Sequence, residues 1–366
     1  MDRSSVHLKN IPTLVLLALS IFALGLAGCG ESAPPEESMK KAEEPAEAWP
    51  PQLPGYAAMT VPADNPMTEE KVELGRMLYY DARLSGDGVR SCYGCHLEEH
   101  GLATGDKLAI GAFDKTLTRN VPTMWNVGYY DKWYWDGRAT ALEAQVKGAW
   151  SGGNMGATGA DGAPSMDAVC ANLQAIAGYA DKFQAVFGEA CTPDNVAKAV
   201  ASFMRTIVAS DSAWVKFRNG DEAALSADAK AGYDIFANKA KCTNCHDGLL
   251  MTDMQFHNVG IGCEGDKCAD VGRSKVSGNE ADTGAFKTPT LFDVSKSGPY
   301  FHDGSVATLE EAVHLMATGG KANKFLDEKN LADAKNAALT PDDEAKLVAF
   351  LKELTANYHI EKPMLP

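Results

Sequence analysis

The sequence has few basic residues for the number of its acidic ones. Lysine and arginine together number 34, and aspartate and glutamate together number 49, which gives the 366 residues a formal net charge of −15. A strongly negative chain repels nucleic acid and anionic lipid, whereas it suits a basic protein partner. We therefore expect no nucleic-acid function.

Long apolar runs are also scarce, and the longest lies near the N-terminus. Residues 11–27 are largely apolar, follow Arg3 and Lys9, and lead into Leu-Ala-Gly-Cys at Cys29. This pattern is typical of a bacterial lipoprotein signal segment over residues 1–29, whose cleavage leaves a lipidated Cys29 at the start of the mature chain. A membrane-spanning anchor is the alternative, because the 17 residues of the run reach the lower end of the spanning range. Both interpretations place the rest of the chain outside the cytoplasm.

Residues 30–58 contain little that could pack into a core. They are rich in proline, glutamate and alanine, so we expect a disordered tether. Gly30 directly after Cys29 fits sorting to the outer membrane, where a lipid anchor would be the only membrane attachment of a protein on the periplasmic side. The remaining length is too great for one typical domain and suits two, which we place at 59–211 and 212–366.

Four of the nine cysteines form two C-x-x-C-H motifs, CYGCH at 92–96 and CTNCH at 242–246. In a c-type haem motif the two cysteines bond the porphyrin vinyl groups, and the histidine ligates the iron from the proximal side. Zinc sites and thioredoxin-like redox pairs also use C-x-x-C, but they do not require the adjacent histidine. The sequence therefore predicts two covalently attached haem c groups, held by Cys92, Cys95, His96, Cys242, Cys245 and His246.

Four further cysteines remain after Cys29 and the haem cysteines are assigned. An even number in an oxidising compartment indicates disulfides. Cys263 and Cys268 are the safer pair because only four residues separate them. Cys170 and Cys191 form the pair that elimination leaves, with free buried thiols as the alternative.

A 28-residue segment occurs twice without a gap, at 119–146 and 286–313, with a constant offset of 167. Each copy predicts a turn followed by a helix, and residues three and seven positions apart share one face of that helix. If this face looks onto a haem, the corresponding residues of the two copies can be compared directly. They are Leu142, Gln145 and Ala149 in the first copy, and Leu309, Ala312 and Met316 in the second.

Met316 occupies the position that Ala149 holds in the first copy. A methionine there predicts a second axial ligand opposite His246, because cytochromes c take methionine in this place. A His/Met haem is closed and has a high potential, which suits electron transfer, whereas the first haem keeps an open position for a small oxidant. A core methionine is the alternative interpretation. Met251 and Met254 also compete for the iron, but they follow the histidine too closely to reach the opposite ring face easily.

The sequence between Glu73 and Leu354 resembles the bacterial di-haem cytochrome c peroxidase family. The resemblance rests on six motifs in order, namely LGRMLYYDARLS, RNVPT, WDGRATALEAQ, CTNCHDG, KTPTL and PYFHDGSVATLEEAVHLM. It implies an all-α protein of two tandem cytochrome c-type haem domains, which the repeat relates by internal duplication. It also implies a peroxidatic first haem, a high-potential second haem, a calcium ion between them, and common homodimers. The implied reaction reduces hydrogen peroxide to water with electrons from a small cytochrome c or cupredoxin.

The resemblance assigns roles to individual residues. Trp135 matches the tryptophan between the two haems, although a large core aromatic is the alternative. Gln145 matches the distal-pocket glutamine. Asn120 matches the residue that gives its side chain to calcium, and Ser297 and Pro299 match residues that give backbone carbonyls. An asparagine that caps a turn is the alternative for Asn120.

Two positions depart from the family pattern. Many members block the first haem with a loop histidine, but the loop 107–118 has no histidine and holds Ala112 at the aligned position. We therefore expect an open first haem in every redox state. Asn154 stands where the family has a distal glutamate, and an amide cannot transfer the proton that peroxide cleavage requires. Glu143 points away from the face of the distal glutamine, which leaves Asp161 as the candidate replacement.

Two other functions remain open. One is that of the relative that oxidises side chains of a partner protein, tryptophan or tyrosine, to mature it. That relative uses a tyrosine as ligand, so Met316 argues against a close match, while Asn154 argues equally against an ordinary peroxidase. The other is a non-enzymatic di-haem electron carrier, in which an open haem would serve no purpose.

Overall fold

The structure, a computed structural model, describes residues 49–356 and 359–366. The signal segment, the lipidation of Cys29 and most of the tether lie outside the described residues, so these expectations stay predictions. The described residues belong to one compact unit. No helix in the part of the chain that the structure describes is long and apolar enough to cross a membrane.

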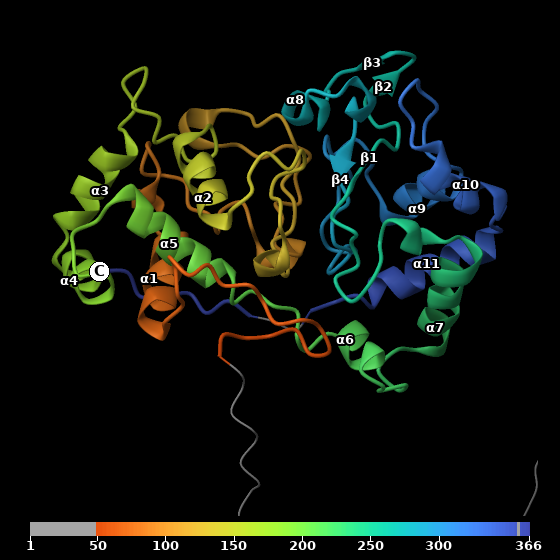
Figure 1. Ribbon diagram of the computed structural model, residues 1–366, viewed down its shortest axis with the longest axis horizontal. Coiled ribbons are helices and arrows are strands. Elements are labelled where there is room, and N and C mark those ends of the chain that lie inside the picture. The colour runs from red at the N-terminus through yellow and green to blue at the C-terminus, as the bar shows by residue number, and fades with distance from the viewer. Residues whose placement is uncertain (1–48, 357–358) are drawn as a thin grey trace, which may run out of the picture. The chain divides into compact units, whose positions relative to one another are not determined.

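The described chain is rich in helix and contains little sheet, as expected for an all-α protein (Figure 1). The α-helices are α1 (Glu69–Tyr80), α2 (Leu142–Ser151), α3 (Met166–Gln174), α4 (Ala177–Phe187), α5 (Pro193–Met204), α6 (Ala213–Arg218), α7 (Ala227–Asp234), α8 (Ser274–Ser277), α9 (Leu309–Ala317), α10 (Glu328–Asn336) and α11 (Pro341–Lys352). The strands are β1 (Phe256–His257), β2 (Cys263–Glu264), β3 (Lys267–Cys268) and β4 (Phe286–Lys287). β1 pairs antiparallel with β4, and β2 pairs antiparallel with β3.

One helix precedes each haem motif and packs against a later helix. In both pairs a glycine of the first helix lies at the contact. α1 packs on α5, and α7 packs on α11. A Cβ on Gly75 of α1 would lie 1.9 Å from the carbonyl oxygen of Ala199, and a Cβ on Gly232 of α7 would lie 2.0 Å from that of Lys346. Only a residue without a side chain permits this approach. Because α1 and α7 each run toward a C-x-x-C-H motif, both motifs follow a helix that is fixed by close packing.

The two copies of the repeat adopt the same backbone geometry. An isolated antiparallel bridge joins Trp133 to Ala139, and 167 positions later another joins Tyr300 to Val306. The residue that follows the first partner of each bridge has a left-handed φ, 66° in one copy and 68° in the other. α2 and α9 then begin at equivalent positions.

The start of α9 is fixed by a capping box. The Thr308 hydroxyl accepts a hydrogen bond from the Glu311 N–H at 3.2 Å, and the Thr308 N–H donates to the Glu311 carboxylate at 3.2 Å. The reciprocal pair satisfies N–H groups that a helix end leaves without partners. Since the first residue of the helix is thereby set, the face that carries Met316 is set as well.

Packing begins inside the segment that the sequence assigns to the tether. Leu53 is 1% exposed, and its N–H donates to the Tyr129 hydroxyl at 2.6 Å. The proline-rich composition of the segment gives no local sign that Leu53 is buried. The packed chain therefore starts a few residues before the expected boundary at residue 58, and the other domain boundaries stay predictions.

The cysteines outside the haem motifs divide into one disulfide and two free thiols. Cys263 and Cys268 are bonded, with sulfur atoms 2.00 Å apart, across the β2–β3 hairpin. Cys170 and Cys191 are free, which was the alternative to their pairing. A hydrogen bond with Cys170, together with burial, raises the pKa of the Cys191 thiol. A thiol of raised pKa forms little thiolate and is a poor nucleophile.

Candidate haem sites

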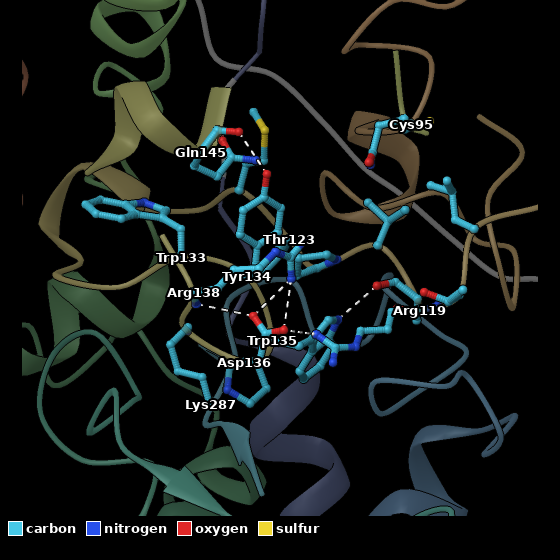
Figure 2. A pocket seen from close by; sticks show the side chains of 18 of the residues that line it. Cys95, Arg119, Thr123, Trp133, Tyr134, Trp135, Asp136, Arg138, Gln145 and Lys287 are labelled. Carbon is cyan, nitrogen blue, oxygen red and sulfur yellow. Dashed lines mark hydrogen bonds and ion pairs between the residues drawn. The ribbon is translucent and has the colours of Figure 1, made fainter. Parts of the chain in front are cut away.

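Each C-x-x-C-H motif opens onto a cavity. The first cavity, of about 720 Å³, is lined by Cys95 and His96, and the second, of about 220 Å³, is lined by Cys242, Cys245 and His246. Figure 2 shows the first cavity from close by, with Cys95 and Gln145 on opposite sides of it. The structure thus brings five of the six predicted haem-binding residues, all but Cys92, to the walls of two cavities.

The two histidines are oriented by the same kind of hydrogen bond. Nδ1 of His96 lies 2.8 Å from the Leu102 carbonyl oxygen, and Nδ1 of His246 lies 3.1 Å from that of Met251. A carbonyl only accepts, so Nδ1 carries the hydrogen and Nε2 keeps its lone pair for a metal. Burial lowers the pKa of His96 to about 4 and also lowers the pKa of His246. Both imidazoles are therefore neutral at neutral pH, which is the form that binds haem iron.

Met316 lies in the wall of the second cavity. It shares this wall with Leu309 and Ala312, the other two residues on the predicted face of α9. Among the described methionines, Met316 alone lines this cavity. Met251, one of the two competing methionines, is instead buried in the core. The ligation of the second haem by Met316 stays a prediction.

Gln145 and Asn154 both line the first cavity. The Tyr134 hydroxyl donates to the backbone carbonyl of Gln145 at 2.9 Å, which anchors this turn of α2. The Ala112 N–H donates to the carbonyl of Asn154 at 3.0 Å and to that of Gly153 at 3.1 Å. The loop with Ala112 is therefore fixed to the segment that presents Asn154.

Neither carboxylate considered as a replacement for the distal glutamate lines the first cavity. Glu143 accepts hydrogen bonds from Arg205 and Asn65, each at 2.7 Å. Burial alone would raise the pKa of the Glu143 carboxyl, but these two partners hold it below its ordinary value. Asp161 is exposed and has a left-handed φ of 52°. The structure does not bring Glu143 or Asp161 to the place of the missing acid.

The sequence of this chain is similar to those of known haem proteins over most of its length. The model of the family described as di-haem cytochrome c peroxidase matches residues 69–223. The cytochrome-c peroxidase IdrP1 of Denitromonas iodatirespirans is 35% identical over 349 residues, which cover 86% of this chain and 90% of that protein. This chain belongs to the di-haem cytochrome c peroxidase family.

Relatives in the di-haem cytochrome c peroxidase family are named either cytochrome-c peroxidase or MauG. The methylamine utilization protein MauG of Methylorubrum extorquens is 37% identical over 311 residues, which cover 83% of this chain and 84% of that protein. The crystal structure of a MauG-like protein associated with microbial copper homeostasis aligns with a TM-score of 0.75 and 31% identity, over 86% of this chain and 98% of that chain. Membership makes this chain an oxidoreductase of the cytochrome-c peroxidase type and implies two haem c groups, which the two cavities fit.

Three residues of this family member, Trp135, Lys287 and Pro289, line both cavities. The indole N–H of Trp135 donates to the Asn120 carbonyl at 2.9 Å, and the Trp135 carbonyl accepts the Lys287 N–H at 2.7 Å. The tryptophan that the resemblance places between the two haems thus stands in the wall that the cavities share. Its role in electron transfer stays a prediction.

Sequence patterns do not single out Lys287, yet it is buried beside Trp135. The side chain is 8% exposed, and its Nζ lies 3.3 Å from the Thr288 carbonyl oxygen and 4.7 Å from the centre of the Tyr130 ring. Burial lowers the pKa of the ammonium to about 8. A cation inside a short strand carries no local signal of burial, because only tertiary packing covers it.

Ion pairs occupy the carboxylates of the first cavity (Figure 2). Asp136 accepts from Arg119 at 2.7 Å and from Arg138 at 2.9 Å, and Arg119 also binds Asp270 at 2.6 Å. Asp136 is 4% exposed. The WDGR motif at 135–138, which contains Asp136 and Arg138, could have indicated part of this network. Since Asp136 and Asp270 are held by arginines, neither is a free acid–base group.

Asn120, the predicted calcium ligand, lines the first cavity. Its side-chain amide donates to the carbonyls of Asp106 and Lys107 at 3.1 and 3.2 Å. An amide that donates both bonds through nitrogen keeps its oxygen for another partner. The participation of Asn120, Ser297 and Pro299 in a calcium site stays a prediction.

Proposed function

We propose that this protein reduces hydrogen peroxide to water at the first haem, with electrons that a small cytochrome c or cupredoxin delivers to the second haem. One peroxide consumes two electrons and two protons and yields two molecules of water. The observation that carries the proposal is the contrast between the two helices, because Met316 of α9 lies in the wall of the second cavity and α2 has Ala149 at the equivalent position. The methionines that line the first cavity, Met124 and Met204, come from outside the repeated helix.

The two haem-binding halves, at 59–211 and 212–366, are proposed to be tandem domains that arose by duplication. The repeated bridge, the repeated left-handed residue after it and the equivalent starts of α2 and α9 support this proposal. Two copies of one unit can keep the haem attachment and differ only at the sixth ligand. One haem could then transfer electrons and the other could react with peroxide although both domains share the same fold.

The side chains at the first site position peroxide but do not supply a free proton carrier. Gln145 and Asn154 both line the cavity, and their amides can donate and accept hydrogen bonds. Cleavage of peroxide requires a proton to move from one oxygen to the other, which an amide does not carry. We therefore propose that this protein reacts with peroxide slowly, with Gln145 and Asn154 as orienting residues.

The side chains at the second site hold an electron-transfer centre. When bound, the haem irons supply the redox chemistry of both sites. His246 is fixed by the Met251 carbonyl, and Met316 offers a thioether that favours a high potential. Trp135 lines both cavities and is the proposed conduit between them.

Steady-state consumption of peroxide by the holoprotein, with a reduced small cytochrome as donor, tests this function. We expect two donor molecules to be oxidised for each peroxide consumed. The His96→Ala variant, which lacks the proximal ligand of the first haem, should lose turnover. Turnover that is absent in the wild-type protein would overturn the peroxidase assignment.

Oxidation of tryptophan or tyrosine side chains on a partner protein is the second candidate. Asn154 favours it, because the side chain that would serve peroxide cleavage is missing, and the 37% identity to MauG of Methylorubrum extorquens supports it. Met316 favours the peroxidase, because it gives the second haem the ligand set of an electron carrier. A high rate with a protein substrate and no two-to-one donor stoichiometry would favour the oxidase. A pure electron carrier remains the third choice.

The location and accessory features are also proposals. A lipid on Cys29 would anchor the protein to the outer membrane on the periplasmic side, where a cytochrome donor is available. A calcium ion held by Asn120, Ser297 and Pro299 would stabilise the boundary between the haem sites. Homodimers are implied by the resemblance alone.

A further inference from the structure

Both ring nitrogens of His257 face carboxylates. Nδ1 lies 2.5 Å from an oxygen of Asp327, and Nε2 lies 2.9 Å from an oxygen of Asp253. A carboxylate only accepts hydrogen bonds, so each nitrogen must carry a hydrogen and the ring is an imidazolium. Burial alone would lower the pKa of His257, but hydrogen bonds with Asp253, Cys245 and Asp327 raise it. With its side chain 12% exposed, His257 is a fixed and sheltered positive charge.

This charge lies beside the attachment point of the second haem. His257 lines the second cavity, and its ring lies within 4.8 Å of the Cys245 sulfur and of an Asp253 carboxylate oxygen. The Asp253 N–H donates to the Cys245 carbonyl at 2.8 Å. The carboxylate on one side of the imidazolium is therefore fixed to the haem-binding segment itself.

The carboxylate on the other side comes from a different element. Asp327 caps the N-terminus of α10, where its side chain accepts from the Asn330 N–H. The Asn330 side chain donates to the other oxygen of Asp327 at 2.8 Å and lines the second cavity. Three segments, namely the haem-binding segment, β1 and the start of α10, thus converge on His257.

Cysteine, aspartate and histidine in one cluster could also indicate a metal site. Two features argue against a metal here. The Cys245 sulfur is consumed when it bonds the haem vinyl group, and both nitrogens of His257 are already bonded to carboxylates. The cluster is therefore a charged, hydrogen-bonded group and not a metal site.

We propose that the cluster of His257, Asp253 and Asp327 sets the reduction potential of the second haem, with His257 as its positioning residue. The proposal rests on the proposed function only in requiring a redox-active haem at Cys245. One imidazolium and two carboxylates leave one net negative charge beside the ring. Negative charge favours the oxidised iron, so His257 offsets part of the lowering that its two partners cause.

Two substitutions that change the charge in opposite directions test this. His257→Gln removes the positive charge and leaves both carboxylates, so the midpoint potential of the second haem should fall. Asp327→Asn removes a negative charge and keeps the helix cap, because asparagine also caps well, so the potential should rise. Each change should alter the ratio of oxidised to reduced haem about tenfold at a fixed potential, which is about 59 mV for one electron.

Potentiometric titration of the holoprotein, followed by the spectra of both haems, provides the readout, with the first haem as an internal reference. His314→Gln is the matched control, because His314 lies on α9 but is exposed and pairs with Glu344 instead. Opposite shifts confined to the second haem support the proposal even if peroxide turnover is absent. Unchanged potentials, shifts in the same direction, or equal shifts in the control variant would overturn it, whatever the turnover.

Discussion

The thioether of Met316 lies in the wall of the second cavity, on the face of α9 that Leu309 and Ala312 share. We expect Met316→Ala to convert the second haem to a high-spin or water-ligated form and to lower its potential, because the lost thioether favours ferrous iron. Absorption spectra and redox titration measure both effects.

Met251→Leu is the control for this change. Met251 is buried in the core and lies outside the second cavity, and leucine keeps the backbone carbonyl that orients His246. Such a volume-conserving replacement costs less than about 1.5 kcal/mol. If Met316→Ala leaves the spectrum and the potential like those of the parent, Met316 is a core residue.

Asn154 lies in the first cavity, where the described wall offers no free carboxylate. We expect Asn154→Glu to raise the rate of reaction with peroxide, because a positioned acid–base group contributes about 10²- to 10⁴-fold. Stopped-flow mixing of the oxidised protein with peroxide measures the rate. Asn154→Gln is the matched control, since glutamine has the shape of glutamate but cannot carry the proton. An equal gain in both variants would show that size, not proton transfer, limits the reaction.

At the scale of elements, the loop 107–118 is held close to the distal side of the first cavity. Ala112 donates two backbone hydrogen bonds to Gly153 and Asn154, and a Cβ on Gly111 would lie 2.1 Å from the Gly153 carbonyl oxygen. Since the loop has no histidine, we expect the fully oxidised protein to show one high-spin and one low-spin haem. It should also react with peroxide without prior reduction.

Electron paramagnetic resonance of the resting protein tests this expectation. Two low-spin signals would mean that another side chain closes the first site. Met124 and Met204 are the described methionines that line the first cavity, so they would be the first to replace. Leucine at each position would identify the ligand by restoring a high-spin signal.

The sequence could indicate both haem motifs and the place of Met316, because covalent attachment sets the spacing of a C-x-x-C-H motif and the repeat aligns two helices residue by residue. It could not indicate the cluster around His257, because the bond to Asp327 joins residues 70 positions apart without a local pattern. The burial of Lys287 and of Leu53 could not be predicted either, because Lys287 lies in a short strand and Leu53 lies among prolines. In each of these cases tertiary packing, which no local window records, decides the environment.

At the scale of the whole molecule, the N-terminal segment lies outside the described residues and supplies the proposed attachment to the membrane. We expect Cys29→Ser to release the protein from the membrane fraction with its haem content unchanged, because packing in the described chain begins only near Leu53. Cell fractionation and haem staining measure this. Retention in the membrane with an uncleaved N-terminus would favour the spanning anchor instead.

The wall shared by the two cavities affects when electrons and peroxide must reach the protein. Trp135, Lys287 and Pro289 each line both cavities, so the two proposed haem sites share part of one wall. With one haem at each site, as we propose, a fully reduced molecule would store two electrons, which is the number that one peroxide consumes. A donor that carries one electron can arrive twice, at unrelated moments, before any peroxide is present. On this proposal, the reduction of peroxide would not have to wait for a further encounter with the donor.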